Sequence, residues 1–228
     1  MTTEYGKTAT STQELRDFYD QAFKQTIIKD EERAYRWMAQ KLFRPYLAGK
    51  MVLDVGCGGG FFLSELRPLV KFASGIDLSG EALRIASRSN KSGVLVQSSA
   101  EELPYISHSF DIVICLGSLE HFLNVQKALG EMRRVVRHDG WIFVMVPNLF
   151  WYKDVISVLR TGNIGHRNQR YEFFATPSEW KETVSKAGLK IEKCWKYNGI
   201  AKSAFKQWWK DRLIPMNLSY HIILGCRP

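Results

Sequence analysis

The residues best suited to chemistry come directly after the first apolar run of the chain, in "MVLDVGCGGGFF" (51–62). Asp54 begins the pattern Asp-x-Gly-x-Gly-x-Gly, in which Gly56, Gly58 and Gly60 stand at every second position. A glycine loop between a strand and a helix presents backbone N–H groups at the sheet edge where nucleotide ligands bind. In a dinucleotide loop, GxGxxG, the third glycine lets the helix pack beneath a pyrophosphate. Phe61 occupies that position here, so the loop argues against an NAD-dependent oxidoreductase.

Two acidic residues bear on the ligand of the loop: Asp54 helps to choose the nucleoside, whereas the placement of Asp77 suits NAD and S-adenosylmethionine equally. Asp54 would repel phosphates, but it suits a ligand that carries an ammonium group and a sulfonium charge. Asp77, in "GIDLS", ends the next apolar run, where a carboxylate can accept hydrogen bonds from two ribose hydroxyls. S-adenosylmethionine has these groups and no phosphate, so we expect it as the cofactor and S-adenosylhomocysteine as the product. The alternative is a local role, with Asp54 as a turn or capping acid and Asp77 as an acid at a helix N-terminus.

The elements that must position these residues alternate along the chain. Short apolar runs rich in β-branched residues are separated by segments long enough for helices, which is typical of a parallel sheet with helices on both faces. This pattern predicts a doubly wound α/β fold. The expected strands are 50–56, 71–78, 93–99, 110–117 and 140–148, and the expected helices between them are 61–69, 80–89 and 124–140.

The alternation loosens beyond Asn148. Thr176 or Ser178 can cap a helix there, and Gly188 can close it. The helical insert between the last two strands leaves room for a lid. The expected elements are a helix at 149–160, a polar loop at 161–170, a helix at 176–189, a strand at 190–197, the helical insert at 201–216 and a last strand at 218–226.

Residues 12–47 read as two further helices, the second ending near Pro45 and Gly49. We therefore divide the chain into an N-terminal helical cap, 1–50, and a cofactor-binding domain, 51–228. The substrate-side insertions of that domain are expected at about 149–175 and 198–217. The apolar residues at helical spacing in the second helix are Ala34, Trp37, Met38 and Leu42.

From about Met51 to Gly188 the chain resembles the class I S-adenosylmethionine-dependent methyltransferases. The stretches that carry the resemblance are "LDVGCGGG", "GIDLS", "SSAEELPYISHSFDIVICLGSLEHF", "GWIFVMVPN" and "FFATPSEWKETVSKAGL". The family implies a Rossmann-like sheet of seven strands with the last strand antiparallel, and "LSYHIILGC" fits that strand. The expected fold is thus a doubly wound seven-stranded sheet with N-terminal helices and a helical lid insertion.

The resemblance also implies which residues bind the cofactor. Asp54 would face the methionine amino group, while the glycine loop gives room to the ligand and Asp77 holds the ribose. Ser99 stands where the family often has an aspartate that accepts from the adenine amino group, so we expect a weaker contact there. Tyr19 would roof the cofactor, and Trp37 could do so, although core packing is the preferred interpretation of Trp37. The remaining expected binding residues are Gly56, Cys57, Gly58, Leu78, Ala100, Glu101, Leu116 and Gly117.

His121 is the candidate catalytic base. Methyl transfer is an in-line displacement in which the protein aligns the reactants, and an oxygen or nitrogen acceptor also needs to lose a proton. His121 lies in "GSLEHF", just past the fourth expected strand; the alternative is a structural histidine, and His166 is a weaker candidate. Around Glu120 and His121 the chain resembles the O-methyltransferases of ubiquinone biosynthesis, in which a further glutamate three residues before the pair helps to hold a divalent cation. This chain has Gly117 there, so we predict no metal.

The formal net charge of +9 is concentrated in the last third of the chain. Residues 148–228 hold 14 basic and 6 acidic side chains, and five of the seven tryptophans. Basic and aromatic groups together suit an anionic or aromatic substrate, nucleic acid or a membrane surface, and the alternative is a solvated basic face over buried tryptophans. The helix at 201–213 could be a lid, a contact with an anionic membrane or a helix packed on the body, which is the preferred interpretation. Its apolar face holds Ala201, Ala204, Phe205 and Trp208, and its basic face Lys202, Lys206 and Lys210.

Two further features of the sequence concern the cellular location of the protein and the state of its cysteines. No run reaches the roughly 18 apolar residues of a membrane span, and the polar start lacks an apolar signal region, so we expect a cytoplasmic protein that at most touches a membrane peripherally. The four cysteines lie far apart without a CxxC pair, which favours reduced thiols over disulfides or zinc ligands.

These features predict methyl transfer from S-adenosylmethionine to an oxygen or nitrogen of a small molecule that is anionic, aromatic or lipid-like. One alternative is RNA methylation, which the positive charge favours. Against it, the chain reads "CLGS" (115–118) where enzymes that methylate exocyclic amino groups typically have an N/D-PPY tetrad. We therefore do not expect a nucleic-acid partner. A third possibility is a non-catalytic partner protein that binds the cofactor. The sequence leaves the acceptor and the oligomeric state open.

Overall fold

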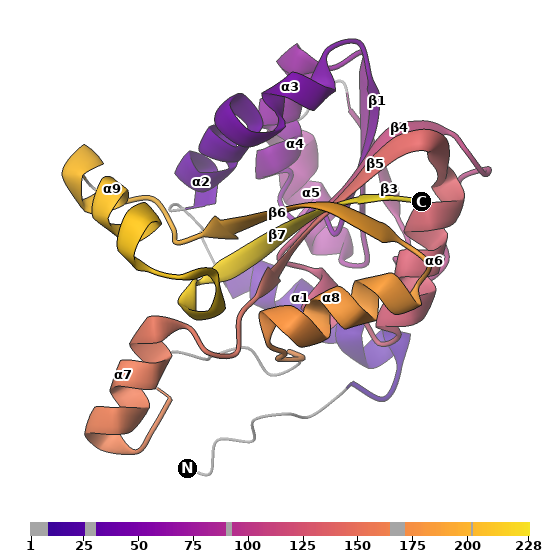
Figure 1. Cartoon of the computed structure of the whole chain (residues 1–228). Coiled ribbons are helices and arrows are strands. Elements are labelled where there is room, and N and C mark those ends of the chain that lie inside the picture. Colours follow the sequence, from indigo (N-terminus) through magenta and orange to yellow (C-terminus); the bar gives the residue numbers. More distant parts are fainter. Residues whose placement is uncertain (1–8, 26–30, 90–92, 165–171, 202) are drawn as a thin grey trace.

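A computed structural model describes residues 9–25, 31–89, 93–164, 172–201 and 203–228. Its centre is a seven-stranded sheet in the order β3-β2-β1-β4-β5-β7-β6, with helices on both faces (Figure 1). The strands β1 to β5 run parallel, and β7 is antiparallel to both β5 and β6. The predicted fold, including the antiparallel last strand, is therefore confirmed. The strands are β1 Met51–Val55, β2 Phe72–Asp77, β3 Val94–Gln97, β4 Phe110–Leu116, β5 Val136–Pro147, β6 Lys190–Tyr197 and β7 His221–Arg227.

The helices follow the expected alternation. Helices between successive parallel strands cross the faces of the sheet, as right-handed connections of this fold class require. The described helices are α1 Thr12–Gln25, α2 Glu31–Trp37, η1 Met38–Phe43, α3 Arg44–Leu47, α4 Phe61–Leu66, η2 Arg67–Leu69, α5 Gly80–Ser89, η3 Leu119–His121, α6 Val125–Val135, α7 Tyr152–Thr161, α8 Pro177–Lys186, α9 Ala204–Leu213 and η4 Met216–Leu218. None of them is long and apolar enough to cross a membrane.

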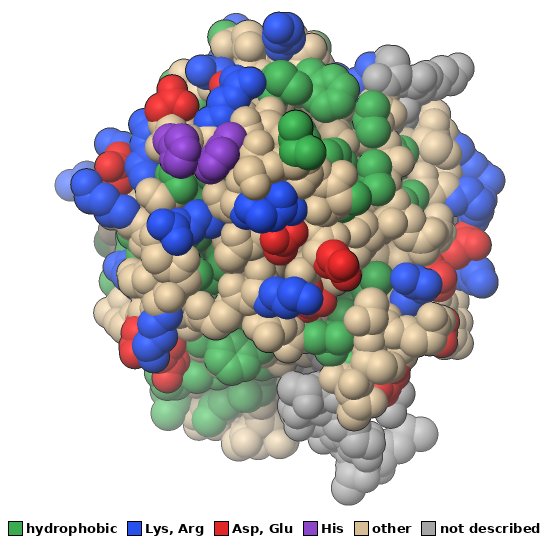
Figure 2. Space-filling view, turned by 90° about the vertical axis from the view of Figure 1, so that its right-hand side faces the viewer, with side chains coloured by type: hydrophobic (Ala, Val, Ile, Leu, Met, Phe, Trp, Pro, Cys, Tyr) green, Lys and Arg blue, Asp and Glu red, His purple; other side chains and the backbone are tan. Residues whose placement is uncertain are grey.

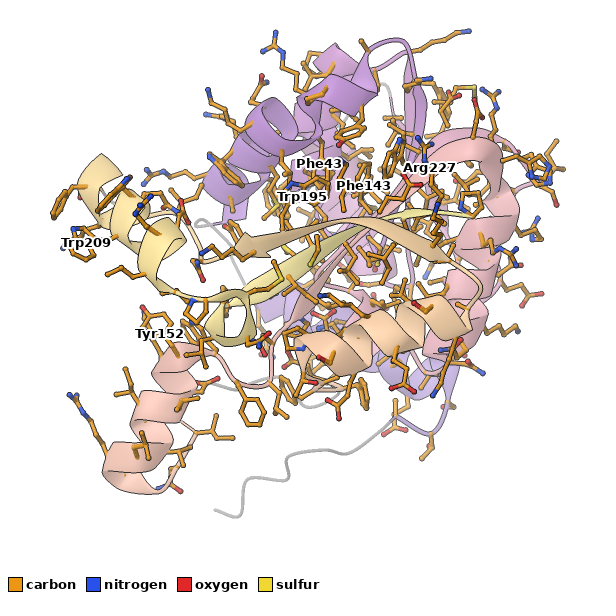
Figure 3. The ribbon with its side chains drawn as sticks, viewed as in Figure 1. Phe43, Phe143, Tyr152, Trp195, Trp209 and Arg227 are labelled. Carbon is orange, nitrogen blue, oxygen red and sulfur yellow. The ribbon has the colours of Figure 1, made fainter. Side chains whose placement is uncertain are left out.

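Two hydrophobic cores lie on opposite faces of the sheet, because successive side chains of a strand point to opposite sides. Leu53 belongs to the core that α6 and α8 close, whereas its neighbour Val52 belongs to the core closed by η1, α3 and α4. In the second core the rings of Phe43 and Phe143 lie 5.0 Å apart, and Trp195 of β6 lies beyond them (Figure 3). Burial on both faces explains why the strands read as nearly continuous apolar runs.

The second N-terminal helical run ends at Leu47, as the predicted range 12–47 has it. It continues past Pro45 because this residue lies in the first turn of α3, where a missing N–H is tolerated. The side chain of Trp37 is 38% exposed, so the expected core packing of Trp37 is wrong. Met38 is buried, as its helical spacing indicated, and Ala39 and Phe43 of the π-helical segment η1 also fill the core.

Of two helix boundaries near the sheet, one differs from its prediction and the other confirms one of two predicted caps. The helix expected at 124–140 ends at Val135, and β5 begins at Val136, which pairs with Phe110 of β4. For α8, Thr176 is the cap: its hydroxyl accepts from the Glu179 N–H at 3.3 Å and the Glu179 carboxylate accepts from the Thr176 N–H at 2.7 Å. This reciprocal pair satisfies two free donors of the helix start, and it settles the choice between the two candidate caps.

Helices α7 and α9 extend beyond the ends of the strands instead of covering a face of the sheet (Figure 1). Helix α7 follows β5, and α9 lies between β6 and β7, so both belong to the two expected insertions. Phe205 and Trp208 of α9 are 68% and 53% exposed. The preferred interpretation of α9, an apolar face packed on the body, is therefore wrong. Lys202 lies outside the described residues.

Candidate functional site

A pocket of about 200 Å³ lies at the carboxyl ends of β1, β2 and β4, beneath α1. This is the edge of an open α/β sheet at which ligands bind. The predicted site residues that line the pocket are Tyr19, Gly56, Cys57, Gly58, Asp77, Leu78, Ser99, Ala100, Glu101, Leu116, Gly117 and His121. Among the predicted residues, Asp54 lies behind this lining, in β1.

The glycine loop after β1 depends on glycine at alternate positions. Gly56, Gly58 and Gly60 have φ angles of 73°, 52° and 74°, a left-handed conformation that other residues rarely adopt. At Gly56 a Cβ would also lie 2.6 Å from the Ser118 hydroxyl, which donates to the Gly56 carbonyl at 3.1 Å. The loops after β1 and β4 therefore cross in contact, and sequence reasoning missed Ser118 because it lies 62 residues away.

Phe61 begins α4 and lines the pocket. A Cβ on Gly59 would lie 2.9 Å from the Phe61 ring, so the ring packs tightly against the glycine loop. A phenyl group thus occupies the place where a dinucleotide loop brings a glycine beneath pyrophosphate. The geometry agrees with a pocket for a nucleoside without phosphates.

Asp54 is a buried carboxyl group whose Oδ2 has no hydrogen-bond partner among the described residues. Its side chain is 3% exposed. Burial, and then the charge of Asp77, raises the pKa of Asp54 to about 8. The cap of α4 is Gly60, so Asp54 does not serve as the capping acid of that helix. A buried acceptor without a partner is costly, and a cationic group in the pocket would offset that cost.

Asp77 ends β2 and joins two loops. Its Oδ2 accepts from the Gly58 N–H at 2.8 Å, and its Oδ1 accepts from the Ser79 N–H at 2.9 Å. Burial raises the pKa of Asp77, and these two hydrogen bonds offset part of that rise. The start of α5 is capped by Ser79, whose hydroxyl accepts from the Ala82 N–H at 3.1 Å. Asp77 therefore fixes the glycine loop against the β2 to α5 turn.

Ser99, Ala100 and Glu101 form the side of the pocket after β3. The Ser99 hydroxyl donates to the Glu101 Oε2 at 2.6 Å and accepts from the Glu101 N–H at 3.2 Å. The Glu101 Oε1 accepts in turn from the Asn124 N–H at 2.9 Å. Because the Ser99 proton is already donated, this hydroxyl can offer the pocket only acceptor capacity, as a base amino group requires.

Helix α1 covers the pocket and is tied to α5. Asp20 Oδ1 accepts from the Ser79 hydroxyl and, at 3.1 Å, from the Glu81 N–H. Phe23 lies one turn further along α1, and its ring lies 3.4 Å from where a Gly58 Cβ would stand. Asp20 and Phe23 escaped sequence reasoning because their partners lie far along the chain, so that no local motif marks them.

A polar cluster of Tyr19, Glu120 and His121 forms the end of the pocket after β4. The rings of Tyr19 and His121 lie 5.8 Å apart, and the His121 Nε2 lies 3.9 Å from the Glu120 Oε1. Glu120 is 5% exposed, and its Oε2 has no hydrogen-bond partner among the described residues, as is also true of the Tyr19 hydroxyl.

Burial raises the pKa values of Glu120 and Tyr19, which favours their protonated, neutral forms. Desolvation, followed by the charge of Glu172, raises the pKa of Glu120 to about 8, against the lowering effect of a backbone hydrogen bond. Desolvation and the charge of Glu120 raise the pKa of Tyr19 far above its usual range. A carboxyl group that titrates near neutrality beside a histidine can hold or release a proton during catalysis.

Gly117 occupies the position three residues before the Glu-His pair, where the resemblance to the O-methyltransferases of ubiquinone biosynthesis implies a further glutamate. Its φ is 66°, its N–H donates to the Met145 carbonyl at 2.9 Å, and a Cβ there would lie 3.9 Å from the Glu120 Oε1. Over the described ranges, no three His, Cys, Asp or Glu side chains are grouped so as to hold a metal ion. His166 lies outside the described residues. The four cysteines carry free thiols, three of them buried.

Comparison with known proteins identifies the family to which the chain belongs. Residues 53–144 match the family described as "Methyltransferase domain". The chain is 33% identical over 205 residues to the ubiquinone biosynthesis O-methyltransferase of Thiobacillus denitrificans, covering 77% of this chain and 88% of that protein. It is 30% identical over 209 residues to the protein of the same name from Rhizobium etli, covering 88% and 82%.

A solved structure shares the fold. The S-adenosylmethionine-dependent methyltransferase of Mesorhizobium loti superposes with a TM-score of 0.64 at 15% identity, covering 88% of this chain and 98% of that one. Identity at this level supports the architecture and not the substrate.

Proposed function

The chain belongs to the class I S-adenosylmethionine-dependent methyltransferases. We propose that it methylates a small aromatic or lipid-like molecule, with oxygen as the first choice of acceptor atom and nitrogen as the second. The observation that carries this proposal is the polar cluster of Tyr19, Glu120 and His121 at the end of the pocket. The cofactor of the family is S-adenosylmethionine, which supplies an electrophilic methyl group when bound.

The residues of the pocket fit that cofactor. Asp54 brings an unpartnered carboxylate oxygen for the methionine ammonium group, and the left-handed glycines leave room for the ligand beside the backbone. Asp77 keeps lone pairs for the ribose hydroxyls, since each of its oxygens accepts one backbone hydrogen bond. The remaining contacts of this proposed site are Leu78, Ser99, Ala100 and Glu101 at the adenine, Cys57, Leu116 and Gly117 at the methionine end, and Tyr19 as the roof.

His121 takes the proton of the acceptor in this proposal. Its ring lines the pocket and is held against the Tyr19 ring. A positive charge that develops on His121 favours the ionised form of Glu120, because the two groups lie 3.9 Å apart in a buried place. Glu120 would thus position His121 and stabilise its protonated form. Helix α1 excludes water above the reacting atoms, so the nucleophile stays poorly solvated.

The surroundings of the cluster favour an apolar acceptor. Phe122 and Leu123 lie beside His121 in the pocket lining, and Tyr35 lies elsewhere in the same lining. The curated relatives are named for ubiquinone biosynthesis, which supports an oxygen acceptor on an aromatic ring. Gly117 leaves Glu120 and His121 without the additional glutamate, so the proposed mechanism uses the histidine and no metal ion.

RNA methylation is the second candidate, and the charge of the last third favours it. The catalytic cluster lies inside a pocket roofed by α1, where a small molecule fits better than a base on a strand. Binding to oligonucleotides that weakens steeply with salt would favour RNA.

The test uses the full chain with S-adenosylmethionine and matched panels of phenols, catechols, carboxylates and amines. We expect S-adenosylhomocysteine and a methylated phenol or catechol, identified by mass spectrometry, with activity that survives chelator. His121→Gln should lower kcat by on the order of 100-fold and leave cofactor affinity within about twofold. Cofactor binding without methylation of any acceptor would instead indicate a non-catalytic partner protein.

A further inference from the structure

Helix α9 presents its apolar side chains to solvent. Phe205, Trp208, Trp209 and Leu213 are between 42% and 68% exposed, and their spacing of three to four residues places them on one helical face. Trp209 points away from the body in Figure 3.

The opposite face of α9, which is polar, holds the helix to the body. Lys210 donates through its Nζ to the Asn198 carbonyl at 3.2 Å, and Asn198 donates through its Nδ2 to the Lys210 carbonyl at 3.2 Å. One turn earlier, the Gln207 side chain accepts from the Ala201 N–H at 2.7 Å. This arrangement inverts the usual amphipathic rule, in which the apolar face packs inward.

Helix α7 shows the same inversion. Asp154 is 6% exposed, whereas Ile156 and Leu159 are 42% and 81% exposed. A buried acid and exposed aliphatic side chains are the reverse of what a surface helix of a monomer requires.

The two helices are linked at their bases. The rings of Trp151, just before α7, and Tyr220 lie 4.5 Å apart. The Tyr220 N–H donates to the Asn198 side chain at 3.3 Å, and Asn198 holds α9 through Lys210. Figure 1 shows α7 and α9 on the same side of the molecule. We call the exposed apolar side chains of these two neighbouring helices the α7–α9 surface, which comprises Ile156, Leu159, Phe205, Trp208, Trp209 and Leu213.

The charges at this surface are mainly positive. Lys153 lies 5.0 Å from the Trp151 ring, and Arg212 lies 5.8 Å from the Trp208 ring. The exposed side chains of Arg160 and Lys206 add two further positive charges. The acidic Asp211 accepts a hydrogen bond from the Gln207 side chain. The face that Figure 2 shows, on the side of the molecule away from α7 and α9, instead has basic and acidic side chains interspersed.

We propose that the α7–α9 surface binds the headgroup region of an anionic lipid bilayer. Tryptophan rings and basic side chains are the groups that favour that region, and each Lys or Arg near an anionic surface adds to binding. A second copy of the chain fits less well, because pairing two copies through this surface would bring like charges together. Binding at the bilayer is independent of which acceptor the enzyme methylates.

The test is sedimentation of the full chain with two kinds of vesicle. One is phosphatidylcholine alone, and the other contains about 30 mol% phosphatidylglycerol, which makes its surface negatively charged. We expect binding to the anionic vesicles only, weakening with salt. Trp208→Ser/Trp209→Ser and Lys206→Glu/Arg212→Glu should each lower the partition coefficient on the order of tenfold.

The matched control is Lys71→Glu/Arg88→Glu, which makes the same charge change at exposed positions of the β2 and α5 side, away from α9. It should bind as the wild type does, and all variants should keep their cofactor affinity, which reports on folding. The proposal is overturned if wild-type protein stays in the supernatant with anionic vesicles at low salt, or if the control loses as much binding as Lys206→Glu/Arg212→Glu. A dimer in solution that Trp208→Ser/Trp209→Ser dissociates, or tighter binding to RNA than to vesicles, would also overturn it.

Discussion

The pocket and the α7–α9 surface break the ordinary rule of burial in opposite directions. In the pocket, Asp54 and Glu120 are buried acids with oxygens that lack a hydrogen-bond partner among the described residues. On the α7–α9 surface, Trp208 and Trp209 are aromatic side chains exposed to solvent. Each arrangement costs free energy in the isolated chain. These two costs motivate the two proposals: a cationic ligand would remove the cost in the pocket, and an anionic bilayer would remove the cost on the α7–α9 surface.

The largest effect expected on the pocket side follows from Asp77→Ala. This substitution removes the proposed acceptor for the ribose hydroxyls and also the two backbone hydrogen bonds that hold the Gly58 loop and Ser79. Affinity for S-adenosylmethionine should fall by about 100-fold, as expected for the loss of hydrogen bonds to a charged group. Calorimetry measures it, and Asp77→Asn, which keeps one acceptor oxygen, should fall less. Unchanged affinity would mean that the nucleoside binds elsewhere.

Asp54 should make cofactor binding depend on pH. Its pKa of about 8 keeps it protonated in the free protein below that pH, whereas a neighbouring ammonium group favours the carboxylate. Binding must then release a proton, so affinity should rise between pH 6 and 7.5 by up to about tenfold per pH unit. Asp54→Asn should bind more weakly and with a flat pH profile. A steep profile in that variant would assign the proton to another group.

Glu120 should make the free protein less stable as pH rises. The folded pKa values of Glu120 and Asp54, both about 8, lie above their unfolded values. The stability each contributes is therefore fully present below the unfolded pKa and is lost as pH rises through the folded one. From about pH 5 to 8, each group lowers the free energy of unfolding by up to about 1.4 kcal/mol per pH unit.

Glu120→Gln should reduce that slope, and denaturant unfolding at several pH values measures it. The matched variant is Glu101→Gln at the same pocket, whose carboxylate is already hydrogen-bonded to Ser99 and Asn124. It should leave the slope as in the wild type. Equal slopes in the wild type and Glu120→Gln would show that Glu120 is not the buried acid that titrates.

The smallest effect belongs to the α7–α9 surface. Trp209 is 42% exposed, so Trp209→Ser should change the free energy of unfolding by no more than about 0.5 kcal/mol. Trp180 is fully buried and donates to the Pro147 carbonyl at 2.8 Å, and Trp180→Ser should cost about 3 to 5 kcal/mol. Thermal and denaturant unfolding compare the two. A large loss from Trp209→Ser would mean that this tryptophan stabilises the fold.

Much of the pocket could be read from local patterns. The spacing of Asp54 and the glycines, and the position of Asp77 after an apolar run, are visible because strand ends meet at one edge of a parallel sheet. Asp20 and Ser118 were not visible, because their partners lie about 60 residues away along the chain. Glu120 was noted only because its pair with His121 resembles the O-methyltransferases of ubiquinone biosynthesis. A sequence does not show that a carboxyl oxygen will be buried without a hydrogen-bond partner.

The orientation of helices was the least predictable feature. Two neighbouring apolar positions of the second N-terminal helix were both expected to face inward, but Met38 is buried whereas Trp37 is 38% exposed. The amphipathic pattern of α9 was correct as a pattern, yet the structure turns its apolar face outward. A hydrophobic period gives the face of a helix and not the direction in which that face will point.

Short-range spacing and the chemistry of single residues were enough to predict the succession of strands and helices along the chain, the glycine loop and the class of cofactor. Three properties became visible in the folded chain alone: which buried acids lack a hydrogen-bond partner among the described residues, how α1 covers the pocket, and that the tryptophans of α9 face solvent. Those properties depend on contacts between distant segments, whose free energies are set by burial and not by neighbours in the chain.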